Sequence, residues 1–136
     1  MKLRTKTNLI VAMQCGALDA AKYQLFAACA RMDGDWELAK AFQNAADIDR
    51  TGRFSRETEL QGLVADSPDN LRHTIEAETK EAHMFAEFAR EAMEDRDLNA
   101  AALFNRISRY KRESCSRFQA ILATKGVHSN RRNVMA

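Results

Sequence analysis

Apolar residues recur every three or four positions through four long segments of this chain, and short polar turns separate the segments. In the second segment, the apolar stripe consists of Leu38, Ala41, Phe42, Ala45 and Ile48. In the fourth segment, it consists of Leu103, Phe104, Ile107, Tyr110 and Phe118. This spacing places apolar side chains along one face of a helix. We therefore predict helices over about residues 6–32, 36–64, 68–94 and 98–124, and no strands.

The second pair of predicted helices repeats the first. Residues 5–54 align with residues 67–116 at a constant offset of 62 without a gap, and 11 of these 50 positions are identical. Asp35 and Asp97 occupy equivalent turns and are well placed to cap the second helix of each pair. Thr5 and Ser67 are equivalent candidates for capping the first helix of each pair.

Two helix pairs that bury their apolar stripes against each other form an all-α four-helix bundle. The joining segment, residues 65–67, is too short to separate domains, so we predict one domain over residues 1–126. We expect Lys125 and Gly126 to end the last helix, and residues 127–136 to form a flexible C-terminal tail.

The first predicted helix is apolar on more than one face. Its large apolar residues are Leu9, Ile10, Val11, Met13, Leu18, Tyr23, Leu25 and Phe26. One small core does not accommodate all of them, so we expect a homodimer in which a second copy covers the remainder.

The charge balance argues against nucleic acid and membrane surfaces as partners. Lys and Arg number 21 against 19 Asp and Glu, so the net charge is only +2. The apolar stretch of the first helix is interrupted by Gln14, Asp19, Lys22 and Gln24, which are costly within a bilayer. We expect no nucleic acid and no membrane partner.

The three cysteines, Cys15, Cys29 and Cys115, form no Cys-x-x-Cys pair. An odd number of cysteines without a secretory signal is typical of a reducing compartment, so we expect a cytoplasmic protein. We interpret Cys15 and Cys29 as buried small apolar residues. A redox role for Cys15 or Cys115 is the alternative.

Five segments carry a framework of aromatic residues and alanines. They are KYQLFA (22–27), AKAFQNAADIDR (39–50), SPDNL (67–71), EAETKEAHMFAEFA (76–89) and AALFNRISRYKRE (101–113). This framework, over about residues 5–124, resembles the ferritin-like superfamily and, within it, the diiron domain of rubrerythrin. The resemblance implies a bundle of two repeated helix pairs and an iron-dependent oxidoreductase or peroxidase.

In that family, the first helix of each pair supplies a Glu ligand and the second supplies Glu-x-x-His. The resemblance carries these positions over to Gly16, Asp49, Gly52, Glu78, Lys111 and Ser114, with Glu81 as an additional carboxylate. Both histidines and two of the glutamates are therefore missing, and a third glutamate is shortened to aspartate.

Lys111 adds a positive charge at a ligand position, and a protonated lysine has no lone pair to offer a metal. We therefore predict a degenerate metal site without a cofactor; iron or another divalent metal held by Asp49, Glu78 and Glu81 is the alternative. We expect Lys111 to pair with Asp49 or Glu78, because an unpaired buried charge is very costly. The gapless offset of 62 leaves no evident room for the π-bulge that accompanies many diiron sites.

Three functions follow as hypotheses. The leading one is a rubrerythrin-like protein that has lost its diiron site and works without catalysis, as a dimeric scaffold or by binding a protein or a small molecule. An alternative is an oxidoreductase of the peroxidase or ferroxidase type with a remodelled carboxylate site. The third is a structural subunit that pairs with an active paralogue.

Overall fold

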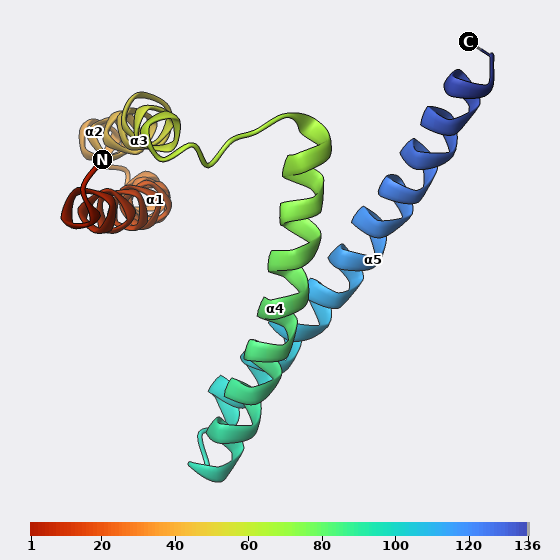
Figure 1. Ribbon diagram of the computed structural model, residues 1–136. Coiled ribbons are helices and arrows are strands. Elements are labelled where there is room, and N and C mark those ends of the chain that lie inside the picture. Colours follow the sequence, from red (N-terminus) through yellow and green to blue (C-terminus); the bar gives the residue numbers. More distant parts are fainter. Residues whose placement is uncertain (136) are drawn as a thin grey trace. The chain divides into compact units, whose positions relative to one another are not determined.

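The chain is helical throughout the computed structural model, which describes the backbone of residues 1–135 and the side chains of residues 1–125. The elements are α1 (Leu3–Met32), α2 (Trp36–Asp47), η1 (Ile48–Arg53), α3 (Phe54–Gln61), α4 (Ser67–Glu94) and α5 (Leu98–Met135), shown in Figure 1. No strand occurs among the described residues, so the predicted all-α class is confirmed. The chain divides into two compact units, Met1–Val64 and the residues from Ala65 on. The predicted single bundle of both helix pairs stays a prediction.

In the first unit, α1 packs against α2, η1 and α3. The buried contact is made largely of alanines: Ala20, Ala27 and Ala30 on α1, and Ala39 and Ala46 on α2. Because these side chains are small, the two helix backbones lie close together.

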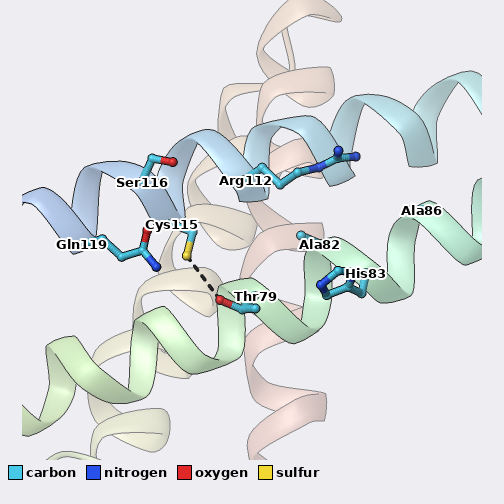
Figure 2. Close-up of a pocket in the computed structure, with 8 residues that line it drawn as sticks. All are labelled: Thr79, Ala82, His83, Ala86, Arg112, Cys115, Ser116 and Gln119. Atoms are coloured by element: carbon cyan, nitrogen blue, oxygen red, sulfur yellow. Dashed lines mark hydrogen bonds between the residues drawn. The ribbon is translucent and has the colours of Figure 1, made fainter.

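In the second unit, α4 and α5 run antiparallel to each other (Figure 1). Ala82 of α4 lies against α5 (Figure 2) and is 5% exposed, and Ala89 and Ala101 are also buried. Ser108 is fully buried and donates a hydrogen bond of 2.8 Å to the carbonyl oxygen of Ala82. This bond satisfies the buried hydroxyl at the contact between the two helices.

Equivalent positions of the two units have similar geometry. The rings of Phe26 and Phe42 make an edge-to-face contact with centroids 5.4 Å apart, and those of Phe88 and Phe104, each 62 residues later, do so at 5.7 Å. Each aromatic contact links the two helices of its unit and adds to their association, while Phe26 and Phe88 are 42% and 37% exposed in their units.

The turns are also equivalent. Gly34 and Arg96, 62 residues apart, both have a positive φ, of 77° and 62°. The side chain of Asp35 accepts a hydrogen bond from the backbone N–H of Leu38, as predicted, and Asp97 accepts one from Ala100 at 3.4 Å. The two turns therefore close each helix pair in the same way.

Two of the predicted helix starts are wrong. Helix α1 begins at Leu3, so Thr5 lies inside it, and Lys2 precedes it without a side-chain cap. Asp66, not Ser67, caps α4 by accepting from the N–H of Asp69 at 2.9 Å. Either Asp or Ser is suited to this role, and the aspartate stands one residue earlier.

The predicted end of the last helix is also wrong, because α5 continues past Lys125 and Gly126 to Met135. A glycine ends a helix when it adopts a left-handed conformation. Gly62 does so after α3, with φ 66°. The predicted flexibility of residues 127–136 stays a prediction, and the side chains there lie outside the described residues.

The predicted second helix, 36–64, is interrupted by the π-helical segment η1. Sequence alignment gave no room for such a segment, and this expectation is wrong. The last identity of the repeat is Arg50 with Arg112, so only four aligned positions follow it. A wider turn that takes up one extra residue after Arg50 is therefore not visible in the sequence offset of 62, because no later identity tests the alignment. The hydroxyl of Thr51 donates to the carbonyl oxygen of Asp47 at 2.6 Å within the same segment.

Several predicted core residues are exposed in their unit. Leu38, Ile48, Leu103 and Tyr110 are 44%, 66%, 51% and 57% exposed. Cys15 and Cys29 are exposed as well, so the interpretation of both as buried is wrong. Among the described residues, no helix combines the length and the apolar character needed to cross a bilayer.

Candidate functional site: carboxylates held by lysine and arginine

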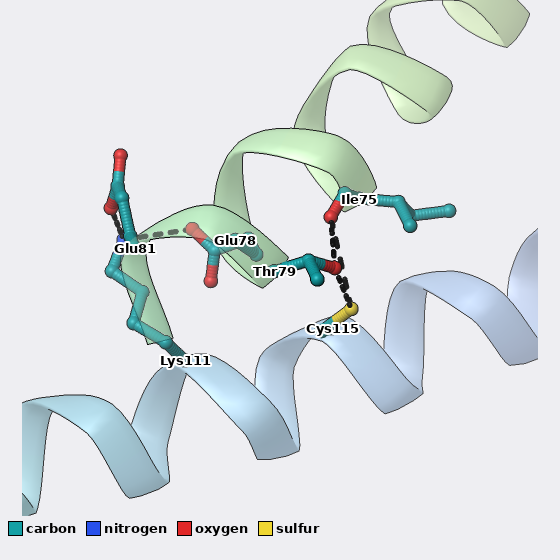
Figure 3. Close-up of polar contacts among 6 residues, drawn as sticks. All are labelled: Ile75, Glu78, Thr79, Glu81, Lys111 and Cys115. Carbon is teal, nitrogen blue, oxygen red and sulfur yellow. Dashed lines mark hydrogen bonds and ion pairs between the residues drawn. The ribbon is translucent and has the colours of Figure 1, made fainter. Parts of the chain in front are cut away.

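In the second unit, Lys111 lies between two carboxylates of α4 (Figure 3). Its Nζ is 2.8 Å from Oε1 of Glu78 and 2.7 Å from Oε2 of Glu81. The side chains of Lys111 and Glu78 are 22% and 13% exposed, whereas Glu81 is 41% exposed. Lys111 therefore bridges an inner carboxylate and an outer one, and the predicted pair of Lys111 with Glu78 is confirmed.

The electrostatics of this cluster keep Lys111 charged. Hydrogen bonds to Glu78 and then Glu81 raise the pKa of Lys111 above its ordinary value, and partial burial offsets this only in part. Each carboxylate interacts with an ammonium that remains protonated at neutral pH. Oε2 of Glu78 is buried and has no hydrogen-bond partner among the described groups.

In the first unit, Arg53 takes a comparable position between carboxylates. Its Nε donates to Oε1 of Glu57 at 2.9 Å, and its Nη1 lies 3.8 Å from Oδ1 of Asp49. Its Nη2 donates to the carbonyl oxygen of Ala12 on α1 at 3.2 Å. The hydrogen bond to Glu57 raises the pKa of Arg53. Oε2 of Glu57, like that of Glu78, is buried without a partner among the described groups.

Arg53 and Glu57 were missed in the sequence because the π-helical segment changes which side chains face α1. The resemblance places a ligand position at Gly52, ten residues after Phe42 on a regular helix. Gly52 is exposed, however, and a Cβ added to it would meet nothing within 4 Å. The wider turn brings Arg53 to the inner face in its place. Asp49, Arg53 and Glu57 follow one another at intervals of four residues. This spacing indicates ion pairs along one helix face and could have identified the cluster from the sequence.

Gly16 of α1 is buried and faces the Arg53 cluster. A Cβ at this position would lie 3.6 Å from both Nε of Arg53 and Oε2 of Glu57, which is ordinary contact. A glutamate here would extend into the space that the Arg53 guanidinium and the Glu57 carboxylate fill. The absence of a side chain at Gly16 therefore leaves room for the ion pair beside it.

Ser114 and Cys115 of α5 are both buried, at 7% and 8% exposure. The Sγ of Cys115 lies 3.3 Å from Oγ1 of Thr79 and 3.8 Å from the carbonyl oxygen of Ile75 (Figure 3). Cys115 is thus enclosed by α4, whereas Cys15 is exposed on α1. The two predicted redox thiols lie in different units.

The predicted site residues thus fall into two clusters, one within each unit. Asp49 and Gly16 belong to the first, where Arg53 is the cation, and Glu78, Glu81 and Lys111 belong to the second. Within the described part of the chain, no three His, Cys, Asp or Glu side chains are gathered so as to hold a metal ion.

The donor set of these clusters does not fit a diiron centre of the kind that the sequence resemblance implies. Arginine and protonated lysine donate hydrogen bonds and offer no lone pair to a metal. Their positive charge would also repel two divalent cations at close range. Among the comparisons with known proteins, no family model matches the chain, and no curated protein or solved structure does so at a significant level.

Proposed function

We propose that this protein is a rubrerythrin-like homodimer that has lost the diiron site and functions by binding or as a scaffold, without metal chemistry. The observation that carries the proposal is the position of Lys111, whose Nζ lies within 2.8 Å of Glu78 and 2.7 Å of Glu81. Of the ligand positions that the resemblance implies, only that of Glu78 still carries the expected glutamate. A metal at that carboxylate would have to displace a charged hydrogen-bond partner.

The first unit supports the same proposal through different residues. Arg53 neutralises Asp49 and Glu57, two carboxylates that would otherwise be available to a metal. Partly buried carboxylates require a counter-charge, because removal from water disfavours the ionised form. In a diiron protein the metals provide this charge, and here we assign the role to Arg53 and Lys111.

The fold in this proposal is a ferritin-like bundle of both helix pairs. Each pair alone buries mainly alanines, and the largest fully buried side chain among the described residues is that of Ser108. Aromatic and aliphatic residues such as Phe88, Leu103 and Tyr110 remain exposed on the second unit. Burying such residues is the main source of stability for a helical domain, so we expect a further layer of helices to cover them.

The dimer in this proposal forms through an apolar stripe on α1. Val11, Leu18, Leu25 and Met32 are spaced by seven residues and are 51%, 66%, 68% and 88% exposed. The intervening stripe positions are Gln14, Ala21 and Ala28, which are exposed and uncharged. A large apolar residue at every seventh position, with uncharged residues between, is a pattern by which two helices pack along their length. A second copy of α1 offers the same stripe, so we take it as the occupant.

An activity assay separates this function from the oxidoreductase alternative. The full chain, incubated with ferrous iron, should show no peroxide reduction or iron oxidation above the rate of the buffer. Glu78→Ala should leave that rate unchanged. Turnover in the wild type that disappears in Glu78→Ala would establish the remodelled carboxylate site instead.

A further inference from the structure

A groove between α4 and α5 lies beside Cys115, on residues other than Lys111 and its carboxylates (Figure 2). Its volume is about 420 Å³. The lining residues are Thr79, Ala82, His83 and Ala86 from α4, and Arg112, Cys115, Ser116 and Gln119 from α5. This volume is within the range of small-molecule sites. The groove combines an apolar floor of alanines with hydroxyl, amide, imidazole and guanidinium groups.

Arg112 is the charged group of this groove and is held in place. Its Nη2 donates to Oγ of Ser108 at 2.9 Å, and the hydroxyl of Ser108 donates in turn to the carbonyl oxygen of Ala82. Among the described side chains, no carboxylate lies within 4.0 Å of Arg112. Glu87, one turn beyond His83, is paired with Arg90. The remaining N–H groups of Arg112 are therefore available for an anion.

The internal repeat provides a comparison within the same molecule. A groove of about 270 Å³ in the first unit is lined by Ala17, Ala20, Ala21, Gln24, Arg50 and Phe54, and each lies 62 residues before a residue of the second groove. There, however, Arg50 is paired with Asp47 at 3.4 Å. The position 62 residues after Asp47 is Arg109, so the acidic partner has been replaced by a second base.

Three further lining positions change in the same direction, whereas Gln24 is replaced by the apolar Ala86. From the first groove to the second, Ala17 is replaced by Thr79, Ala21 by His83 and Phe54 by Ser116. Each of these three changes exchanges an apolar side chain for one that hydrogen-bonds. The second groove has thus gained polar groups around an arginine that lacks the acidic partner of its counterpart.

We propose that this groove binds a small organic oxyanion, a carboxylate or phosphate group on a short apolar body. Arg112 binds the anionic group, because a guanidinium matches the geometry of oxyanions with paired N–H donors. His83 and Ser116 provide further polar contacts, and Ala82 and Ala86 contact the apolar body. The site goes beyond the proposed function, since it uses other residues than the Lys111 cluster and does not depend on metal content.

The test is an NMR titration of the full chain, observing backbone amides and the Nε–H of Arg112. Benzoate supplies a carboxylate on an apolar body, inorganic phosphate supplies the anion alone, and benzylamine supplies the body without the anion. Saturable shifts in the groove are expected with benzoate and none with benzylamine. Saturable binding of phosphate through Arg112 would also support an oxyanion site and would show that the apolar body is dispensable.

Arg112→Gln should weaken benzoate binding by about tenfold or more, which corresponds to losing a charge-assisted contact. The matched control is Arg50→Gln, which should leave the affinity unchanged. Gln119→Glu, at an exposed position of the rim, should weaken binding by charge repulsion without affecting folding. Absence of saturable binding, or an equal effect of Arg112→Gln and Arg50→Gln, would overturn the proposal.

Discussion

The Nζ of Lys111 lies 2.8 Å from Oε1 of Glu78, so a protein cation occupies the neighbourhood of this carboxylate. The second oxygen of Glu78 is buried without a partner among the described groups. Lys111 is thus the counter-charge of a carboxylate that has little contact with water. The first unit reaches the same result with Arg53 and Glu57.

Removing the lysine should destabilise the protein. We expect Lys111→Met to lower the free energy of unfolding by about 1–3 kcal/mol, because Glu78 is left partly buried without its charged partner. Glu78→Gln in the same background should recover part of this loss, which a double-mutant cycle in urea measures.

The matched control for this cycle is Lys80→Met. Lys80 pairs with Glu76, but these side chains are 76% and 64% exposed. Exposed pairs contribute little, so the change should stay within about 0.5 kcal/mol. Equal effects of Lys111→Met and Lys80→Met would show that the inner pair has no special role.

The Lys111 pair also predicts a dependence of stability on alkaline pH. The pKa of Lys111 is raised in the folded state above its ordinary value of 10.5. Its stabilising contribution is therefore complete below about pH 10.5 and is lost as the pH rises through the folded-state pKa. The difference in unfolding free energy between wild type and Lys111→Met should be constant up to about pH 10.5 and shrink as the pH rises further. A difference that grows over this range would contradict the assignment.

Two substitutions at Gly16 test the packing beside Arg53. Gly16→Ala should be tolerated or stabilising by up to about 1 kcal/mol, because the new Cβ makes ordinary contacts and alanine favours the helix. Gly16→Glu should destabilise by about 1 kcal/mol or more, because a second carboxylate would approach the buried Glu57 oxygen. Thermal unfolding of both variants measures this. A stabilising Gly16→Glu would show that the cluster accepts a further carboxylate.

The dimer should depend on the α1 stripe. Leu18→Glu combined with Leu25→Glu should shift the protein to monomer in sedimentation experiments, because charges would face each other along the stripe. Leu98→Glu is the matched control, since Leu98 is 63% exposed but lies in the second unit. A dimer that persists in the α1 variant would place the interface elsewhere.

Periodicity predicted the helices and the turns because these depend on residues close in the sequence. The caps at Asp35 and Asp97 and the aromatic contacts of Phe42 and Phe104 lie where the repeat placed them. The pair of Lys111 with Glu78 was also predictable, because a charge at an inner position requires an opposite one.

The cluster in the first unit was not predictable by counting residues along a regular helix. The π-helical segment Ile48–Arg53 advances the inner face by one position, so that Arg53 replaces Gly52 there. Its energy depends on contacts with α1, such as the bond from Arg53 to the carbonyl oxygen of Ala12. An alignment of the repeat does not record such contacts.

The metal content of the full chain tests most directly whether Lys111 and Arg53 replace metal ions beside these carboxylates. The protein is incubated anaerobically with excess ferrous iron, desalted, and measured for iron per chain beside Glu78→Ala. Because Lys111 and Arg53 provide the charge that metals would bring, we expect less than one iron per chain and no difference between the two proteins. Two irons per wild-type chain that are lost in Glu78→Ala would show that Lys111 does not exclude metal from Glu78.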